Sequence, residues 1–297
     1  MQARCGFVKL KPMQENLLST PSFGLVIVGD EILSGKRADK HMSKVIELLA
    51  HRGLQLDYAH YVGDDPQKIT QTLQRAFESG DVVFSCGGIG ATPDDHTRHC
   101  AASALGLALA LHPQAETLIR QRIMDQAKEN GQAYEPDHPN HVHRLNMGMF
   151  PLGAEIIPNP YNKIPGFQCK STDQRLLKKN PWASVYFLPG FPVMAWPMIE
   201  WVLDEYCKPW FKQAAWCEKS VIVYGAMEAA LTPIMIKLEA QFHGVKVFSL
   251  PSVDHPEHGR HIELGVKGRP DLATLAYQEL IKDLHDFGAS IGPELVR

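Results

Sequence analysis

The segment from Asp81 to Thr97 reads DVVFSCGGIGATPDDHT, and it decides the fold that we expect. Its first five residues are mostly apolar and predict a short buried strand. The turn that follows is rich in glycine: Gly87, Gly88 and Gly90. A helix is predicted over residues 94–105. A strand, a glycine-rich turn and a helix in this order are typical of α/β domains, which bind ligands where their parallel strands end.

The glycine-rich turn has the chemistry of an anion site. Glycines let backbone N–H groups approach a phosphate, and the amino end of a helix adds partial positive charge. Asp94 and Asp95 stand at the predicted helix start, where a carboxylate also caps the first turn. Helix capping and ligand binding both explain this acidic pair. The turn is not a dinucleotide-binding fingerprint, because Pro93 stands where the third glycine belongs.

The flanking sequence alternates strand-like and helix-like segments in the manner of βαβ units. Strands are predicted at residues 23–28, 54–62, 81–85, 154–157 and 183–188. Helices are predicted at residues 39–50, 66–79, 94–105, 113–130 and 192–206. We therefore expect residues 23–211 to form a three-layer α/β domain around a mostly parallel sheet.

Two further acidic turns follow predicted strands. Gly29, Asp30 and Glu31 come after the first strand, and Gly63, Asp64 and Asp65 come after the second. The carboxyl ends of parallel strands lie at one edge of a sheet, so Asp30, Asp64 and Asp95 should share a rim. Carboxylates facing a phosphate require an intervening cation, and this donor set suits Mg²⁺. We predict that Asp95 and Asp30 hold the metal.

Residues 212–290 have a different pattern, strand, helix, strand, strand, helix. It predicts a small α+β domain with two helices over a three-stranded sheet. The strands carry more apolar residues than one helical layer should cover: Ile222, Val245, Val247, Ile262, Leu264 and Val266. We expect an exposed apolar sheet face and, through it, a homodimer.

Composition limits the function classes. A formal net charge of −3 over 297 residues gives no bulk attraction to nucleic acid or to an anionic membrane. The six cysteines include no CxxC pair, which favours reduced thiols in a cytoplasmic protein. Residues 1–22 contain no apolar run of the kind that precedes a signal-peptide cleavage site, and we expect them to form an N-terminal extension.

Two histidine clusters are not expected to bind metal. They consist of His138, His141 and His143, and of His255, His258 and His261. Prolines interrupt the first cluster and Gly259 the second, so neither fits the continuous helix of an HExxH zinc site. A nucleophilic role for Cys86 is also not expected, because no general base is identifiable beside it.

The motif order resembles a known family. GDEILSG (29–35), VGDD (62–65), GGIGATPDDHT (87–97) and LPGFP (188–192) occur in the order found in MoaB and Mog proteins and the N-terminal part of CinA proteins. The resemblance is closest to the CinA type, and it implies a MoaB/Mog-like domain followed by a KH-like domain. Residues Asp94, Ala91 and His41 depart from the residues common in the family.

The resemblance also implies an activity. In MoaB and Mog proteins, the aspartates that match Asp64 and Asp95 are tied to molybdopterin adenylylation. The resemblance to CinA-type proteins implies instead a pyrophosphatase, which uses Mg²⁺ or Co²⁺ to hydrolyse nucleotide diphosphates such as ADP-ribose or FAD. We expect this hydrolysis, with Asp64 and Asp95 as catalytic residues. Molybdopterin binding or adenylyl transfer is the alternative. The nicotinamide-mononucleotide deamidase activity of full-length CinA proteins is not expected.

The ligand is therefore expected to be a small nucleotide or pterin. The residues predicted to contact it are Gly29, Asp30, Glu31, Gly87, Gly88, Gly90, Thr92, Thr97, Pro189 and Gly190. We expect no nucleic-acid partner and no membrane partner. KH domains clamp RNA through a GxxG loop, and we predict no such loop between Cys217 and Gly288.

Overall fold

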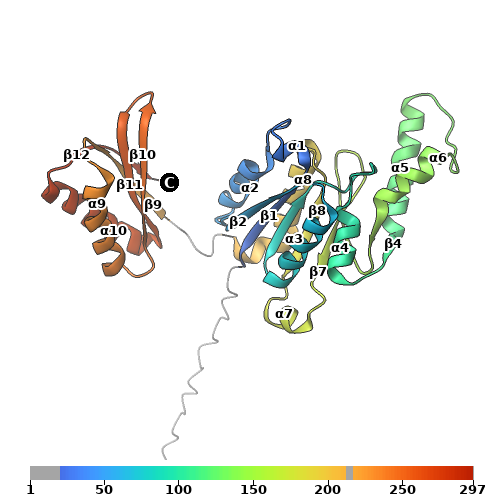
Figure 1. Cartoon of the computed structure of the whole chain (residues 1–297), viewed down its shortest axis with the longest axis horizontal. Coiled ribbons are helices and arrows are strands. Elements are labelled where there is room, and N and C mark those ends of the chain that lie inside the picture. The colour runs from blue at the N-terminus through green and yellow to red at the C-terminus, as the bar shows by residue number, and fades with distance from the viewer. Residues whose placement is uncertain (1–20, 212–216, 297) are drawn as a thin grey trace, which may run out of the picture. The chain divides into compact units, whose positions relative to one another are not determined.

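The computed structural model describes residues 21–211 and 217–296 (Figure 1). The predicted N-terminal extension, residues 1–22, lies outside this description except for its last two residues. The chain divides near Trp210 into two compact units. Of the described residues, one unit contains 21–48 and 55–210, and the second contains 49–54, 211 and 217–296.

The first unit is built on a six-stranded sheet with the order β2-β1-β3-β8-β7-β6. The strands are β1 (Phe23–Val28), β2 (Tyr58–Val62), β3 (Val82–Cys86), β6 (Glu155–Ile157), β7 (Gly166–Lys170) and β8 (Ser184–Leu188). Strands β2, β1, β3 and β8 run parallel to one another, whereas β7 pairs antiparallel with both β8 and β6. The mostly parallel sheet is confirmed. Strand β7 was not predicted, because Gly166, Gln168 and Lys170 give it little strand character.

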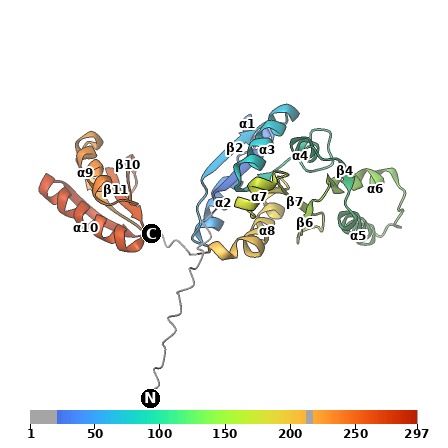
Figure 2. The same cartoon turned by 90° about the horizontal axis from the view of Figure 1, so that it is seen from below.

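Helices cover both faces of this sheet (Figures 1 and 2). On one face lie α3 (Pro66–Ser79) and α4 (Thr97–Leu105), whose apolar side chains pack against Val26, Val83 and Phe187. On the other face lie α2 (His41–Ala50) and α8 (Pro192–Val202), where Lys44 lies over the Trp196 ring. The expected three-layer architecture is therefore confirmed.

Shorter elements complete the first unit. They are α1 (Asp30–Leu33), β4 (Leu109–Leu111), α5 (Pro113–Glu129), α6 (Pro139–Arg144), η1 (Leu145–Gly148), β5 (Met149–Pro151), α7 (Gln174–Lys179), η2 (Leu203–Cys207) and η3 (Lys208–Trp210). Both views place β4, α5 and α6 at the end of the unit furthest from α2 (Figures 1 and 2). The segment from β4 to β5 lies between α4 and β6 in the sequence. Strand β5 pairs with β4 in a separate two-stranded sheet, and β6 of the large sheet follows it.

The second unit is a four-stranded antiparallel sheet with the order β10-β11-β9-β12. Its elements are β9 (Cys217–Tyr224), α9 (Glu228–Gln241), β10 (Lys246–His255), β11 (Gly259–Gly268), α10 (Pro270–Phe287) and β12 (Ser290–Val296). The α+β class is confirmed, but the prediction of three strands was wrong. Strand β12 is an edge strand that contains Gly292 and Pro293, and such residues hide a strand in a sequence.

The predicted apolar open face is also wrong. Val245, Val247, Ile262, Leu264 and Val266 belong to the single core that α9 and α10 share with the sheet. Ile222 lies on the other face but is only 1% exposed. The sequence GVKG at residues 265–268 matches GxxG, yet it forms the end of strand β11 instead of a loop.

Within the described residues, no helix is long and apolar enough to cross a membrane. The described cysteines form no disulfide.

Candidate functional site

The glycine loop after β3 has a conformation that only glycine adopts easily. Gly87 has φ 107° and Gly88 has φ 68°. A Cβ at Gly87 would lie 2.2 Å from the Val28 carbonyl oxygen. Thr97, which is fully buried, donates its hydroxyl to the Gly87 carbonyl at 3.1 Å. Thr97 therefore holds the loop in shape, and the predicted contact of its side chain with a ligand does not fit the structure.

A buried arginine supports the same loop. Arg98 is 3% exposed, and its guanidinium donates to the Ile89 carbonyl at 2.7 Å. Burial lowers the pKa of Arg98, an effect that the nearby Asp95 charge opposes. No sequence pattern marks Arg98 as a site residue, because an arginine in the first turn of a helix is normally solvated. Its positive charge lies beneath the loop and favours an anion above it.

The acidic pair of the loop does not cap α4. That helix begins at Thr97, two residues after Asp95, and no side chain caps it. The Asp95 carboxylate turns back instead and accepts hydrogen bonds from the Thr92 backbone N–H and hydroxyl. The predicted helix start at residue 94 and the capping role are therefore wrong. Asp95 closes the turn at Thr92, while Asp94 is exposed.

Asp30 and Asp64 lie together, as the strand-end argument predicts. The Asp30 backbone N–H donates to the Asp64 carboxylate at 2.9 Å, and the Asp64 N–H donates to the Asp30 carboxylate at 3.2 Å. Gly63 permits this contact, because a Cβ there would lie 2.2 Å from Asp30 Oδ1. One oxygen of each carboxylate is thereby fixed, and both side chains are held at the rim.

Negative charge accumulates at this rim. Burial raises the pKa of Asp64 above its ordinary value, and the charges of Asp30, Glu31 and Asp94 raise it further, although the Asp30 N–H bond lowers it. Glu31 also pairs with the exposed Arg37 at 3.8 Å. Repulsion of this kind is relieved when a cation binds between the carboxylates.

The segment after β8, which contains Gly190 and Phe191, lies beside the glycine loop. A Cβ at Gly190 would meet only the Gly87 Cα, at 3.5 Å, so the two glycine turns are neighbours. The Gly190 carbonyl is 3.1 Å from Nε2 of His41, a residue that is 5% exposed. Next to it, Phe191 is 56% exposed and lies 5.8 Å below the Arg37 guanidinium. An exposed aromatic ring paired with arginine beside the glycine loop is suited to stacking on a planar ring.

The structure also brings one of the discounted histidines to the site. His143 Nε2 lies 3.0 Å from the Ala91 carbonyl, between residues that are 52 positions apart in the sequence. Asn146 lies 3.4 Å from its other ring nitrogen. A carbonyl accepts only from an N–H, so Nε2 carries the proton. Helix α6 thus anchors the glycine loop from outside.

We expect His143→Ala to raise Kd for the ligand by about three- to tenfold, because one hydrogen bond that orders the loop is worth about 1 kcal/mol. His141→Ala on the same helix is the matched control. Its ring contacts the Glu135 carbonyl at 2.6 Å and stacks on Tyr134, away from the loop. Titration calorimetry of both variants tests this role, and an equal Kd for the two would contradict it.

The remaining predicted site residues surround this rim. Gly29 is buried and donates to the Val62 carbonyl at 3.0 Å, which joins the ends of β1 and β2. Gly90 packs against Asp95, and a Cβ there would lie 2.6 Å from its carboxylate. Thr92 is exposed, and Pro189 is half-buried.

Among residues 21–211 and 217–296, no three His, Cys, Asp or Glu side chains are arranged to hold a metal ion. His255, His258 and His261 do come together, with ring centroids 4.9 to 5.6 Å apart. Burial raises the pKa of the Cys86 thiol, which argues against a nucleophilic thiolate there.

Comparison with known proteins places this geometry in a family. Residues 24–209 match the family described as the probable molybdopterin binding domain. The chain belongs to this family. The molybdopterin-binding-domain match covers the first unit, which carries every strand end described above. The resemblance to MoaB/Mog proteins of the CinA type is thereby confirmed.

Individual proteins similar to this chain are consistent with the family match. A protein from Pyrobaculum calidifontis is 28% identical over 275 residues, which cover 88% of this chain and 96% of that protein. A CinA-like protein from Anaeromyxobacter is 30% identical over 182 residues, 61% of this chain and 40% of that protein. The solved structure of a CinA protein of unknown function from Thermoplasma acidophilum is 26% identical, with a TM-score of 0.50, and covers 63% of this chain and 98% of its own.

Proposed function

We propose that this chain is a metal-dependent nucleotide pyrophosphatase of the CinA type, acting on a diphosphate such as ADP-ribose or FAD. The observation that supports it best is the joined pair of Asp30 and Asp64 beside the glycine loop. The pair follows β1 and β2, the loop follows β3, and β1 pairs with both of the other strands. Carboxylates and a phosphate cradle therefore share one edge of the sheet.

The carboxylate oxygens of the site are the type of ligand that a divalent cation binds. Mg²⁺ is commonly held by one or two carboxylates together with phosphate oxygens and water. Asp30 and Asp64 each keep one oxygen that no backbone N–H takes. Asp95, which we also predicted as a ligand, has one carboxylate oxygen bonded to Thr92. We propose Asp30 and Asp64 as the carboxylates that hold the metal; Asp95 does not join them as a third ligand in the described residues, because its carboxylate closes the turn at Thr92.

Each part of the site would have a separate task in hydrolysis. When bound, Mg²⁺ or Co²⁺ supplies charge that offsets the phosphates. Backbone N–H groups of the glycine loop bind the phosphate, while Phe191 stacks on the base. Asp64, whose raised pKa suits a base, accepts the proton of a water molecule as its oxygen bonds to phosphorus. The bond from phosphorus to the bridging oxygen breaks.

A panel assay tests the activity. ADP-ribose, FAD, coenzyme A and molybdopterin would each be incubated with the full chain, with and without Mg²⁺ or Co²⁺. Metal-dependent release of a mononucleotide from any diphosphate supports the proposal. Binding of these compounds without turnover under every condition would overturn it.

The metal gives a second expectation. Chelation should abolish turnover, and added Mg²⁺ or Co²⁺ should restore it. Asp30→Asn should raise the metal concentration needed for half-maximal turnover by about tenfold, because one charged ligand is lost. Asp57→Asn is a matched control, since Asp57 accepts the Phe23 N–H at the opposite end of β1 and β2. An unchanged metal requirement for Asp30→Asn would contradict the assignment.

Molybdopterin binding, with or without adenylyl transfer, is the second candidate. The family description that matches residues 24–209 supports it. The two candidates use the same phosphate cradle and differ in turnover. Stoichiometric molybdopterin binding with AMP transfer from a nucleotide would favour the second candidate. The homodimer stays a proposal that rests on the resemblance, because five of the six apolar residues on which it was predicted pack in the core beneath α9 and α10.

A further inference from the structure

A pocket lies at the amino ends of the central strands of the first unit, at the edge of the sheet opposite the candidate site. Its volume is about 80 Å³. Val82 and Ser184, which begin β3 and β8, line it together with side chains of β7. The rest of the lining comes from the turn before β8 and from η2 and η3. The candidate site lies where β3 and β8 end, so nothing in the proposed hydrolysis uses this pocket.

The part of the lining that belongs to the sheet is polar although it is buried. Gln168 of β7 is 2% exposed, and Ser184 of β8 is 3% exposed. Ser184 pairs with Val82 on one side and with Lys170 on the other, so a small side chain lies between two larger ones. The Gln168 amide N–H donates to the Ser184 hydroxyl oxygen at 3.2 Å. Serine at this position leaves space that a larger apolar residue would fill.

Three buried polar atoms of the lining have no hydrogen-bond partner among the described residues. They are Gln168 Oε1, Trp182 Nε1 and Trp210 Nε1. The two indole rings form a T-shaped pair with centroids 5.4 Å apart, and Trp210 is only 4% exposed. Buried indole N–H groups usually have a partner, and an unpaired buried donor or acceptor is unfavourable. These atoms therefore favour a ligand that bonds to them.

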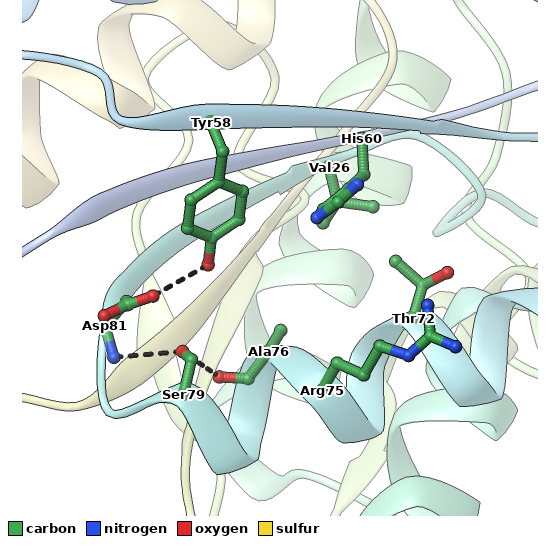
Figure 3. Close-up of a pocket in the computed structure, with 8 residues that line it drawn as sticks. All are labelled: Val26, Tyr58, His60, Thr72, Arg75, Ala76, Ser79 and Asp81. Carbon is green, nitrogen blue, oxygen red and sulfur yellow. Dashed lines mark hydrogen bonds between the residues drawn. The ribbon is translucent and has the colours of Figure 1, made fainter.

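The larger pocket of the first unit, between β2 and α3, lacks this feature (Figure 3). Its volume is about 200 Å³. Tyr58 donates its hydroxyl to Asp81 at 3.0 Å, and Arg75 lies at the other end of the pocket (Figure 3). Among the described residues, none of the buried polar atoms without a partner belongs to its lining. Its polar groups therefore indicate no particular ligand.

The polar atoms of the smaller pocket select against a charged ligand. Gln168 Oε1 can only accept a hydrogen bond, whereas the indole N–H groups can only donate. A carboxylate has no N–H for Gln168 Oε1, and its negative oxygen would face that atom. An ammonium group would face the indole N–H groups and Lys170, which is the charged residue of the lining. A ligand that satisfies all three atoms has both an N–H and a neutral oxygen acceptor.

We propose that this pocket binds a small neutral primary carboxamide. The amide N–H of the ligand donates to Gln168 Oε1, and its carbonyl oxygen accepts from the indole N–H groups of Trp182 and Trp210. The pocket has about half the volume of a cavity of roughly 150 Å³ that holds benzene, so it admits about four non-hydrogen atoms. A planar amide also packs well against aromatic side chains.

Heteronuclear NMR of the nitrogen-labelled full chain tests the proposal with acetamide as the probe. The chain has five tryptophans, and Trp182→Phe and Trp210→Phe identify the indole N–H signals of the two that line the pocket. We expect acetamide to shift both signals saturably, with a Kd of about 1–10 mM, which suits a ligand of this size. Trp196 is the internal control, because its Nε1 is also buried without a described partner but lies outside the pocket.

Two compounds of nearly the same size separate the hydrogen bonds. Acetone has a methyl group in place of the amide nitrogen, and acetate has a charged oxygen there. We expect each of them to bind at least about tenfold more weakly than acetamide. The proposal is overturned if acetamide gives no saturable shift up to about 100 mM. Equal binding of acetone, or an equal shift of the Trp196 signal, would also overturn it.

Gln168→Leu tests the acceptor. Leucine is of similar size and cannot accept a hydrogen bond, so acetamide should bind about tenfold more weakly and lose its advantage over acetone. Gln174→Leu makes the same exchange at the exposed first residue of α7, outside the pocket, and should bind acetamide like the parent chain. Equal acetamide affinity of the two variants would contradict the role of Gln168. The comparison of acetamide with acetone on the parent chain tests the proposal without any variant.

Discussion

Asp64→Asn should lower turnover of the diphosphate substrate by about 100- to 10,000-fold, the usual contribution of a general base. The asparagine side chain retains an oxygen that can accept the Asp30 N–H at the position now 2.9 Å away. It removes the charge that Asp30, Glu31 and Asp94 oppose. The variant should therefore be inactive, folded and more stable than the parent chain in the absence of metal.

The pH dependence of that stability follows from the sign of the pKa shift. A carboxyl whose pKa is raised on folding favours the folded state most when it is protonated, below its unfolded pKa. This stability is lost as the pH rises through the raised pKa of folded Asp64. Asparagine cannot ionise, so the variant should melt at a higher temperature near neutral pH. The difference should shrink as the pH falls through that pKa.

The adjacent residue supplies a control with the opposite outcome. Asp65 caps α3 by accepting the N–H groups of Gln67 and Lys68 at 2.8 and 3.0 Å. Asp65→Ala should cost about 1 kcal/mol of unfolding free energy and leave turnover unchanged. Thermal melting and kinetics of both variants separate the two roles. Loss of stability without loss of turnover in Asp64→Asn would show that Asp64 is only structural.

Much of the fold could be predicted because local pattern and tertiary structure agree in the central strands. β1 and β3 are buried along their whole length, so their apolar runs are readable. Strands at the edges are different. β12 has one Pro, one Gly and a register shift between Ile291 and Glu294, because only one neighbour constrains it. An edge strand needs no continuous apolar pattern, and sequence reasoning therefore missed it.

The apolar face of the small domain was misjudged for a related reason. Counting apolar strand residues does not say which face each one occupies, since a register assignment is needed. Val221, Leu264 and Ser249 are paired across three strands, and that register puts Val247, Leu264 and Val266 under the helices. The helices cover more of the sheet than the sequence pattern indicates.

At the site, the argument from strand ends correctly predicted that Asp30 and Asp64 lie together, because the carboxyl ends of parallel strands lie at one edge of the sheet. The same argument could not predict residues that reach the site from helices. His143 belongs to α6 and bonds to the Ala91 carbonyl, and Arg98 belongs to α4 and bonds to the Ile89 carbonyl. Asp95 was assigned to the helix start because its turn with Thr92 has the sequence of a helix cap.

Gly88→Ala should lower both stability and ligand binding, with a loss of about 3 kcal/mol in unfolding free energy. Gly88 has φ 68°, a conformation that costs alanine energy. The added Cβ would also lie 2.2 Å from Thr97 Oγ1, the atom that fastens the loop to the Gly87 carbonyl. The methyl group therefore has to displace the residue that shapes the phosphate cradle. Ligand binding should become undetectable.

Gly190→Ala is the matched comparison, because it adds the same methyl group on the neighbouring turn. There a Cβ would meet only the Gly87 Cα at 3.5 Å, an ordinary contact, and the residue is exposed. This variant should keep its melting temperature, and at most weaken ligand binding by crowding the rim. Thermal melting together with calorimetry of ADP-ribose binding distinguishes the two variants. If Gly88→Ala kept both its stability and its affinity, the glycine loop would not be the phosphate cradle.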